Sequence, residues 1–147
     1  MARSLDVIGE WWTLLIVREA FFGYRFFDDF QSRLDIPRNT LAARLSKLVN
    51  AGILKKHNFK SDGRKHEYLL TDKGKDLLPV IVALRQWGDK HLFENDGSPL
   101  KLIDKSDQAD IQILKVKSVT GKVLAVDNLA LVSTDKRKKI AFQLGKV

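Results

Sequence analysis

Residues 36–56, IPRNTLAARLSKLVNAGILKK, decide the fold. Their leucines recur at helical spacing, and Pro37 suits the first turn of a helix, where its missing N–H costs nothing. Gly52 is a natural stop, so the stretch predicts a helix over residues 37–51. The side expected to pack inwards holds Leu41, Ala42, Leu45, Leu48 and Val49. The side chains expected to face outwards are Arg38, Asn39, Thr40, Arg44 and Lys47.

A β-hairpin is predicted directly after this helix. Two β-leaning runs, residues 53–59 and 66–71, flank the sequence KSDGRK, whose Asp-Gly pair favours a tight turn. Residues 59–66 would form the tip of the hairpin. Its three basic side chains are Lys60, Arg64 and Lys65.

The residues before position 36 predict three further helices. A short first helix is expected to begin near Ser4 and to end at Gly9. A strongly apolar second helix runs from about Trp11 to Phe22, and so much apolar surface predicts burial on most sides. After a corner at Gly23, the run FFDDFQSRL predicts a third short helix.

A long helix is predicted from Asp72 to about Phe93, with Pro79 in its early part, where a kink would form. Its apolar stripe is longer than one small domain can cover, which suggests pairing with a second subunit. The residues expected at this dimer interface are Leu77, Val80, Ile81, Leu84 and Trp87.

The last third of the chain has a different character. We divide the sequence into residues 1–94, which hold the helices and the first hairpin, and a β-rich extension over residues 95–147. In the extension, a Thr120-Gly121 turn separates short β-type runs at 111–117 and 122–126. The basic cluster at 136–139 is interpreted as a solvated tail. The expected fold class is α+β.

Composition bounds the class of protein. The chain has 147 residues, 44% of them hydrophobic, which suits one compact domain with an appendage. No run approaches the roughly 18 apolar residues that a membrane span needs, so a soluble, cytoplasmic protein is the default. The sequence has no cysteine, which excludes disulfides, thiolate zinc sites and thiol redox chemistry within it. The three histidines are scattered, and no metal or cofactor is predicted.

Positive charge concentrates in the middle of the chain. Residues 36–75 hold ten Lys or Arg against three Asp or Glu, a net charge of +7, whereas residues 1–35 hold four against six. A local field of this kind favours a polyanion as partner, because neutralised phosphates release condensed counterions. A merely solubilising basic face is the alternative interpretation of the charge alone.

A helix, a corner, a helix with a basic outer face and a hairpin with a basic tip follow in the order of a winged helix-turn-helix. An α-helix fits the major groove of B-DNA, where arginine can bind guanine and asparagine can bind adenine. Arg38, Asn39, Thr40 and Arg44 are therefore candidates for base contacts, and Lys47 for a phosphate contact. The hairpin tip would lie near the adjacent minor groove. The predicted partner is double-stranded DNA.

Three motifs resemble those of HxlR-type transcriptional regulators. They are SLDVIGEWWTLLIVREAFFG, RFFDDFQSRLDIPRNTLAARLSKLVNAGIL and HEYLLTDKGKDLLPVIVALRQWG, in the order typical of that family and over about residues 2–93. The resemblance implies a bacterial repressor or activator that acts as a homodimer on a roughly palindromic operator. It also implies that the helix over 37–51 occupies the major groove and that the hairpin tip is the wing.

Three features depart from the pattern of that family. Many relatives carry a sensing cysteine just before the position of Ala2, whereas this sequence has none. Either this site is absent or it lies upstream of residue 1, so thiol switching is not supported within residues 1–147. Pro37 stands where relatives commonly have a serine N-cap, which predicts a more rigid start to the helix. The extension resembles a zinc-binding ribbon of some relatives but lacks its cysteines. We expect it to brace a dimer or to cover a ligand cleft.

Three other functions are weighed against DNA binding. Trp11, Trp12, Phe22 and Tyr24 could line a pocket for a small apolar effector, although plain core packing explains these residues better. A winged helix can also serve as a protein-interaction module, which predicts weak and salt-insensitive association with DNA. Catalysis is disfavoured, because the sequence holds no nucleophile elbow, no glycine-rich phosphate loop and no zinc-protease motif.

Overall fold

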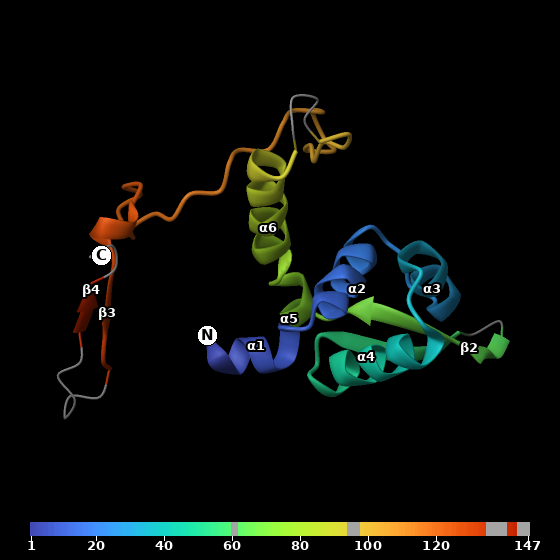
Figure 1. Ribbon diagram of the computed structural model, residues 1–147. Coiled ribbons are helices and arrows are strands. Elements are labelled where there is room, and N and C mark those ends of the chain that lie inside the picture. The colour runs from blue at the N-terminus through green and yellow to red at the C-terminus, as the bar shows by residue number, and fades with distance from the viewer. Residues whose placement is uncertain (60–61, 94–97, 135–140, 144–147) are drawn as a thin grey trace. The chain divides into compact units, whose positions relative to one another are not determined.

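The computed structural model describes residues 1–59, 62–93, 98–134 and 141–143 (Figure 1). The chain forms two compact units, Met1–Leu92 and Phe93–Val147, and each unit is described by itself. Within the described residues, no helix combines the length and the apolar character that crossing a bilayer requires.

Four helices open the first unit: α1 (Ala2–Ile8), α2 (Trp11–Phe21), α3 (Phe27–Leu34) and α4 (Arg38–Asn50). The expectation that the first helix begins near Ser4 is wrong. Because the N–H of Ser4 already donates to the carbonyl of Met1 at 3.0 Å, the helical turn starts ahead of it. α2 ends just before the predicted corner at Gly23, whose φ of 89° is a conformation that glycine adopts without strain.

Two left-handed residues set the direction of α4. Asp35, with a φ of 48°, ends α3 and turns the chain towards α4. At the other end, Gly52 has a φ of 69°, and the N–H of Ile53 donates to the carbonyl of Leu48 at 2.9 Å. This pairing satisfies a carbonyl that the helix end would leave bare, and it leads the chain straight into the hairpin.

The predicted hairpin is formed by β1 (Leu54–Phe59) and β2 (Asp62–Leu70), which pair antiparallel. The pairing is regular up to Asn58, where the register shifts. Phe26, just ahead of α3, forms a β-bridge with Glu67 on the other edge of β2. The hairpin is therefore joined to the helix-turn-helix by backbone pairing.

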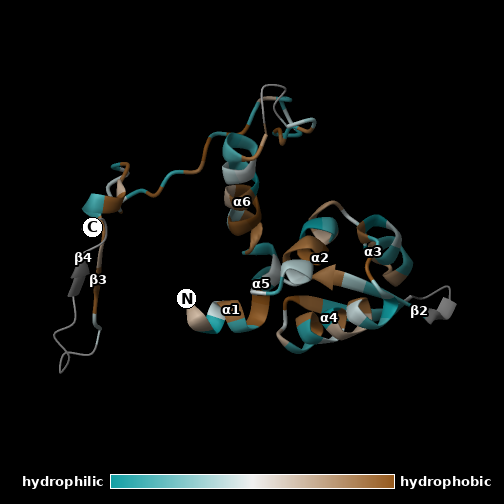
Figure 2. Ribbon diagram, viewed as in Figure 1, coloured by the Kyte–Doolittle hydropathy of each residue, from teal (hydrophilic) through white to brown (hydrophobic). Residues whose placement is uncertain are grey.

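The core of the first unit lies between α2, α3, α4 and the hairpin. Its buried apolar residues are Ile16, Val17, Phe30, Ile36, Leu41, Leu45, Leu48, Ile53, Leu54 and Tyr68. Figure 2 shows apolar and polar residues sharing the α4 ribbon. The three leucines of α4 are buried as predicted, and each contributes roughly 1.5–3 kcal/mol, so the helix cannot rotate about its axis. Ala42 is exposed, contrary to the prediction, because it lies about 100° around the helix from Leu41.

The long helix predicted over residues 72–93 is two helices. α5 (Asp72–Lys75) ends after one turn, and α6 (Leu78–His91) begins after two intervening residues. The cause is Pro79, which has no N–H to donate to the carbonyl of Lys75 and whose ring would crowd that carbonyl. The expected kink is thus a break.

In its described residues, the second unit contains a short 3-10 turn, η1 (Val126–Asn128), and one antiparallel strand pair. β3 (Ala130–Val132) pairs with β4 (Ala141–Gln143), a pairing that the sequence did not predict. The basic cluster predicted to be a solvated tail, residues 136–139, lies outside the described residues.

The hairpin predicted in this unit is only partly formed. A turn closes at Gly121, as expected, with its N–H donating to the carbonyl of Ser118 at 2.9 Å. The runs at 111–117 and 122–126, however, share only the isolated bridge between Lys117 and Val123. No side chain over residues 98–134 is buried, so an apolar face that would hold longer strands together is missing from this segment.

Candidate nucleic-acid interface

α4 presents a polar row to solvent near its N-terminus. Arg38, Asn39 and Lys47 are exposed, and Thr40 is half-buried. Because the leucines on the opposite side are fixed in the core, this row has a defined direction. Four of the five residues predicted to face outwards thus lie on an accessible part of the helix.

Arg44, the fifth residue, has a different position. A terminal nitrogen of its guanidinium lies 2.9 Å from a carboxylate oxygen of Glu10, in the link between α1 and α2. The Arg44 side chain is only 23% exposed. Its Nε is buried and has no hydrogen-bond acceptor among the described residues. Sequence periodicity placed Arg44 in the outward row, but it could not reveal this partner.

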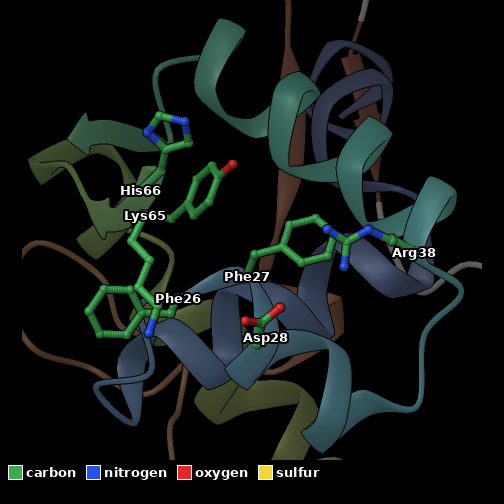
Figure 3. A pocket seen from close by; sticks show the side chains of 7 residues that line it. Phe26, Phe27, Asp28, Arg38, Lys65 and His66 are labelled. Atoms are coloured by element: carbon green, nitrogen blue, oxygen red, sulfur yellow. The ribbon is translucent and has the colours of Figure 1, made fainter. Parts of the chain in front are cut away.

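A pocket of about 230 Å³ lies where α3, the start of α4 and β2 meet (Figure 3). It is lined by Phe26, Phe27, Asp28, Arg38, Lys65, His66 and Tyr68. The guanidinium carbon of Arg38 lies 4.8 Å from the centroid of the Phe27 ring, and Nζ of Lys65 lies 5.7 Å from that of Phe26. Cation–π attraction therefore helps to hold one cation of the helix and one of the wing at the same surface. Burial raises the pKa of the Tyr68 hydroxyl.

Of the three basic residues predicted at the wing, Lys65 is described by the structure, and its side chain is exposed. Lys60 and the side chain of Arg64 lie outside the described residues. A side-chain hydrogen bond joins the two strands at the base of the wing, where Nδ1 of His66 lies 3.0 Å from Oδ1 of Asn58 on the facing strand. This contact favours one orientation of the hairpin.

Sequence reasoning left three exposed residues out of the candidate site. Ser46 lies on the outer face of α4, and Lys55 and Lys56 are exposed at the start of β1. The net charge of +7 over residues 36–75 was the signal that could have included the two lysines. The candidate interface therefore continues from α4 along the first strand of the wing.

The structure separates the residues predicted for a dimer interface into two sets. Val80, Leu84 and Trp87 are 39%, 50% and 57% exposed on α6. Leu77 and Ile81 instead pack against the core of their own chain. An uncovered apolar stripe remains on α6, as predicted, but it is narrower than the sequence indicated.

The four aromatic residues predicted to line an effector pocket do not line the pocket beside Arg38. Trp11 and Trp12 stack on each other with ring centroids 3.9 Å apart. Tyr24 lies beneath the guanidinium carbon of Arg33, 4.0 Å away, and Phe22 is 54% exposed. Among the described residues, no group of three or more His, Asp or Glu side chains could hold a metal ion.

A family model described as HxlR-like helix-turn-helix matches residues 7–96. The chain belongs to the HxlR-like helix-turn-helix family. HTH-type transcriptional regulators of Mycobacterium bovis and Mycobacterium tuberculosis H37Rv, both named as uncharacterised, are each 49% identical over 102 residues. That match covers 69% of this chain and 65% of each relative, so the chain spans less than two thirds of their length.

Solved structures extend the likeness of this HxlR-like chain beyond the matched segment. The crystal structure of PA1607, described as a candidate transcription factor, has a TM-score of 0.84 and 42% identity, over 91% of this chain and 93% of that one. PA1374 from Pseudomonas aeruginosa has a TM-score of 0.66 and 30% identity, over 92% of each chain. The redox regulator HypR in its reduced form has a TM-score of 0.56 and 28% identity, over 60% of this chain and 89% of its own. These likenesses confirm the predicted α+β winged-helix fold.

Proposed function

We propose that this HxlR-like chain is a transcriptional regulator that binds a roughly palindromic operator as a homodimer. α4 would occupy the major groove, and the wing over residues 59–66 would lie near the minor groove. The observation that carries the proposal is the polar row on α4, held outwards by three buried leucines on the opposite side of the same helix. A helix fixed in this way can insert its N-terminal side chains into the groove without first rearranging.

The proposed base contacts come from the first turn of α4. Asn39 is exposed and can bind adenine through two hydrogen bonds, while Arg38 can do the same with guanine. Thr40 is half-buried and would contact only a base or sugar at the groove edge. Lys47 is exposed two turns after Thr40 and is assigned to a phosphate.

The proposed wing contacts are Lys60, Arg64 and Lys65. Lys65 supports the assignment, because it is exposed and lies on the same pocket as Arg38. A wing held beside the helix in this way would place cations along one DNA backbone while the helix lies in the groove. The exposed Lys55 and Lys56 would extend the same positive surface.

The proposed homodimer uses the apolar stripe of α6. Val80, Leu84 and Trp87 remain exposed, whereas α3 and α4 bury the apolar side chains that face the core. A second copy that covers this stripe would remove that area from water, which is favourable by about 25 cal/mol per Å². Two-fold pairing would also present two α4 helices, which accounts for a palindromic operator.

The proposed regulator is not an enzyme. Any response to a small apolar effector would act through binding rather than through thiol oxidation, because the sequence holds no cysteine. The two stacked tryptophans, Trp11 and Trp12, are the natural reporters for such a ligand, since a molecule that displaces one ring from the other changes their fluorescence.

The proposal is tested by titrating the protein into a labelled mixed-sequence duplex at several salt concentrations and following fluorescence anisotropy. We expect binding to weaken linearly on a log–log scale as salt increases, with a slope that corresponds to several phosphate contacts. Selection of an operator from a random duplex pool follows from that result. Flat or absent binding would overturn the proposal and favour a protein-interaction module.

A further inference from the structure

The ion pair between Arg44 and Glu10 lies next to the surface assigned to DNA. Arg44 comes three residues after the buried Leu41 and four before the buried Leu48, so it lies at the flank of the outward row. From this flank its guanidinium contacts Glu10, at 2.9 Å. Glu10 is the residue just before α2 and is 46% exposed.

This pairing changes what Arg44 offers to a polyanion. The carboxylate of Glu10 neutralises its charge, and the partly buried position keeps the guanidinium back from the row of Arg38, Asn39 and Lys47. Because its charge is neutralised and its guanidinium is partly buried, Arg44 adds little to the electrostatic attraction of phosphates. The other arginine of α4, Arg38, lies on an aromatic ring and stays exposed.

The same pairing leaves Arg44 incompletely satisfied. Its Nε is buried without an acceptor among the described residues, and a buried donor of this kind carries a desolvation cost. An arginine normally meets a phosphate through two parallel N–H bonds. A phosphate can therefore compete with Glu10 for Arg44. The strength of the ion pair with Glu10 sets the fraction of time that Arg44 is available to the phosphate.

We propose that Glu10 is a specificity-determining residue that holds Arg44 in reserve. While the pair is closed, one phosphate contact is withheld from DNA of arbitrary sequence, which lowers non-specific affinity. The inference rests on the proposed function, because it requires that α4 faces DNA. It assigns to the link between α1 and α2 a direct influence on the recognition helix.

The test compares Glu10→Gln with the wild-type chain on a labelled random-sequence duplex, by anisotropy at salt concentrations from about 50 to 200 mM. Glutamine keeps the size of the side chain and removes its charge. We expect binding that is about three- to tenfold tighter at the lowest salt and a log–log salt slope that is steeper by about one phosphate contact. Arg44→Ala alone should change the slope little, because the wild-type arginine is already withheld.

A matched control separates release of Arg44 from a general loss of negative charge. Asp35→Asn removes one exposed carboxylate close to the start of α4, at a left-handed position that asparagine tolerates. Both acid variants are also made in an Arg44→Ala background. In that background the gain from Glu10→Gln should shrink to the size of the gain from Asp35→Asn, which should be the same in both backgrounds. Thermal melts followed by circular dichroism verify that each variant is folded.

The outcomes are distinct. Equal gains for the two acid variants, in both backgrounds, would overturn the inference and leave only a charge effect. Weaker binding by Glu10→Gln would also overturn it, because Glu10 would then support a contact made by Arg44. If the wild-type chain binds no duplex at any salt concentration, the proposed function fails first. If the wild-type chain binds duplex DNA and Glu10→Gln binds it with the same affinity and salt slope, the inference fails alone.

Discussion

Glu19 on α2 and Arg33 on α3 are joined by a short ion pair, with Nε of Arg33 2.5 Å from a carboxylate oxygen of Glu19. The Glu19 side chain is 2% exposed, and its other oxygen accepts two bonds from Arg18, at 2.7 and 2.9 Å. The hydrogen bond to Glu19 is the main cause that raises the pKa of Arg33. One buried carboxylate therefore connects α2 with α3, the first helix of the helix-turn-helix.

We expect Glu19→Ala to lower the free energy of unfolding by about 2–3 kcal/mol. The change removes charge-assisted bonds to two arginines and opens a small cavity, but both arginines can turn towards water. Urea denaturation followed by circular dichroism measures the loss. Asp76→Ala, at an exposed position between α5 and α6, is the control and should cost under about 0.5 kcal/mol. Similar losses for the two variants would contradict the assignment.

Asn39→Ala and Lys47→Ala are expected to weaken DNA binding in different ways. If Asn39 binds a base, its loss costs about 1–3 kcal/mol on the selected operator and little on random duplex. If Lys47 binds a phosphate, its loss weakens both duplexes alike and reduces the salt slope by about one. Anisotropy with both duplexes measures each effect, and each variant serves as the control for the other. An equal loss for Asn39→Ala on operator and random DNA would exclude base reading by this residue.

Leu84→Lys is expected to convert a dimer into monomers. Leu84 is 50% exposed at the centre of the α6 stripe, and a lysine there would carry its charge into the proposed interface. Sedimentation velocity at micromolar concentration measures the change. Val119→Lys, at a fully exposed site of the extension, is the control and should remain dimeric. A wild-type chain that sediments as a monomer would contradict the proposed homodimer, whatever the variants do.

Two helical glycines should respond to alanine in opposite directions. A Cβ at Gly74 would lie 2.3 Å from the backbone carbonyl oxygen of Ile53, which cannot move without disturbing the wing. Gly74→Ala is therefore expected to lower the melting temperature strongly. A Cβ at Gly88 would meet only a Leu92 methyl carbon, 3.9 Å away, so Gly88→Ala should stabilise α6 by roughly 0.5–1 kcal/mol. Thermal melts compare the pair, and a neutral Gly74→Ala would show that α5 does not pack against the backbone of Ile53.

The sequence by itself determined the order and type of the elements in the first unit. Leucines spaced one helical turn apart, Gly52 after the last of them and an Asp-Gly pair between two β-leaning runs each act within a few residues of the chain. Their effects are local, so they can be read without knowing what lies opposite. The break between α5 and α6 is also a local effect, because it follows from the missing N–H of Pro79. The sequence predicted only a kink at this position.

Tertiary structure alone decided which polar side chains are available. Arg44 and Lys47 both belong to the side of α4 that was predicted to face outwards, yet Arg44 pairs with Glu10, a residue 34 positions earlier, and Lys47 stays exposed. Glu19 lies in the strongly apolar run of α2, and its burial depends on Arg33 of α3 as well as on the adjacent Arg18. The energy of an ion pair depends on the distance between two side chains in space, and periodicity within one helix carries no information on that distance. The sequence therefore determined that α4 has a polar face, while the packing of α2 against α3 and α4 decided which charges on these helices remain free.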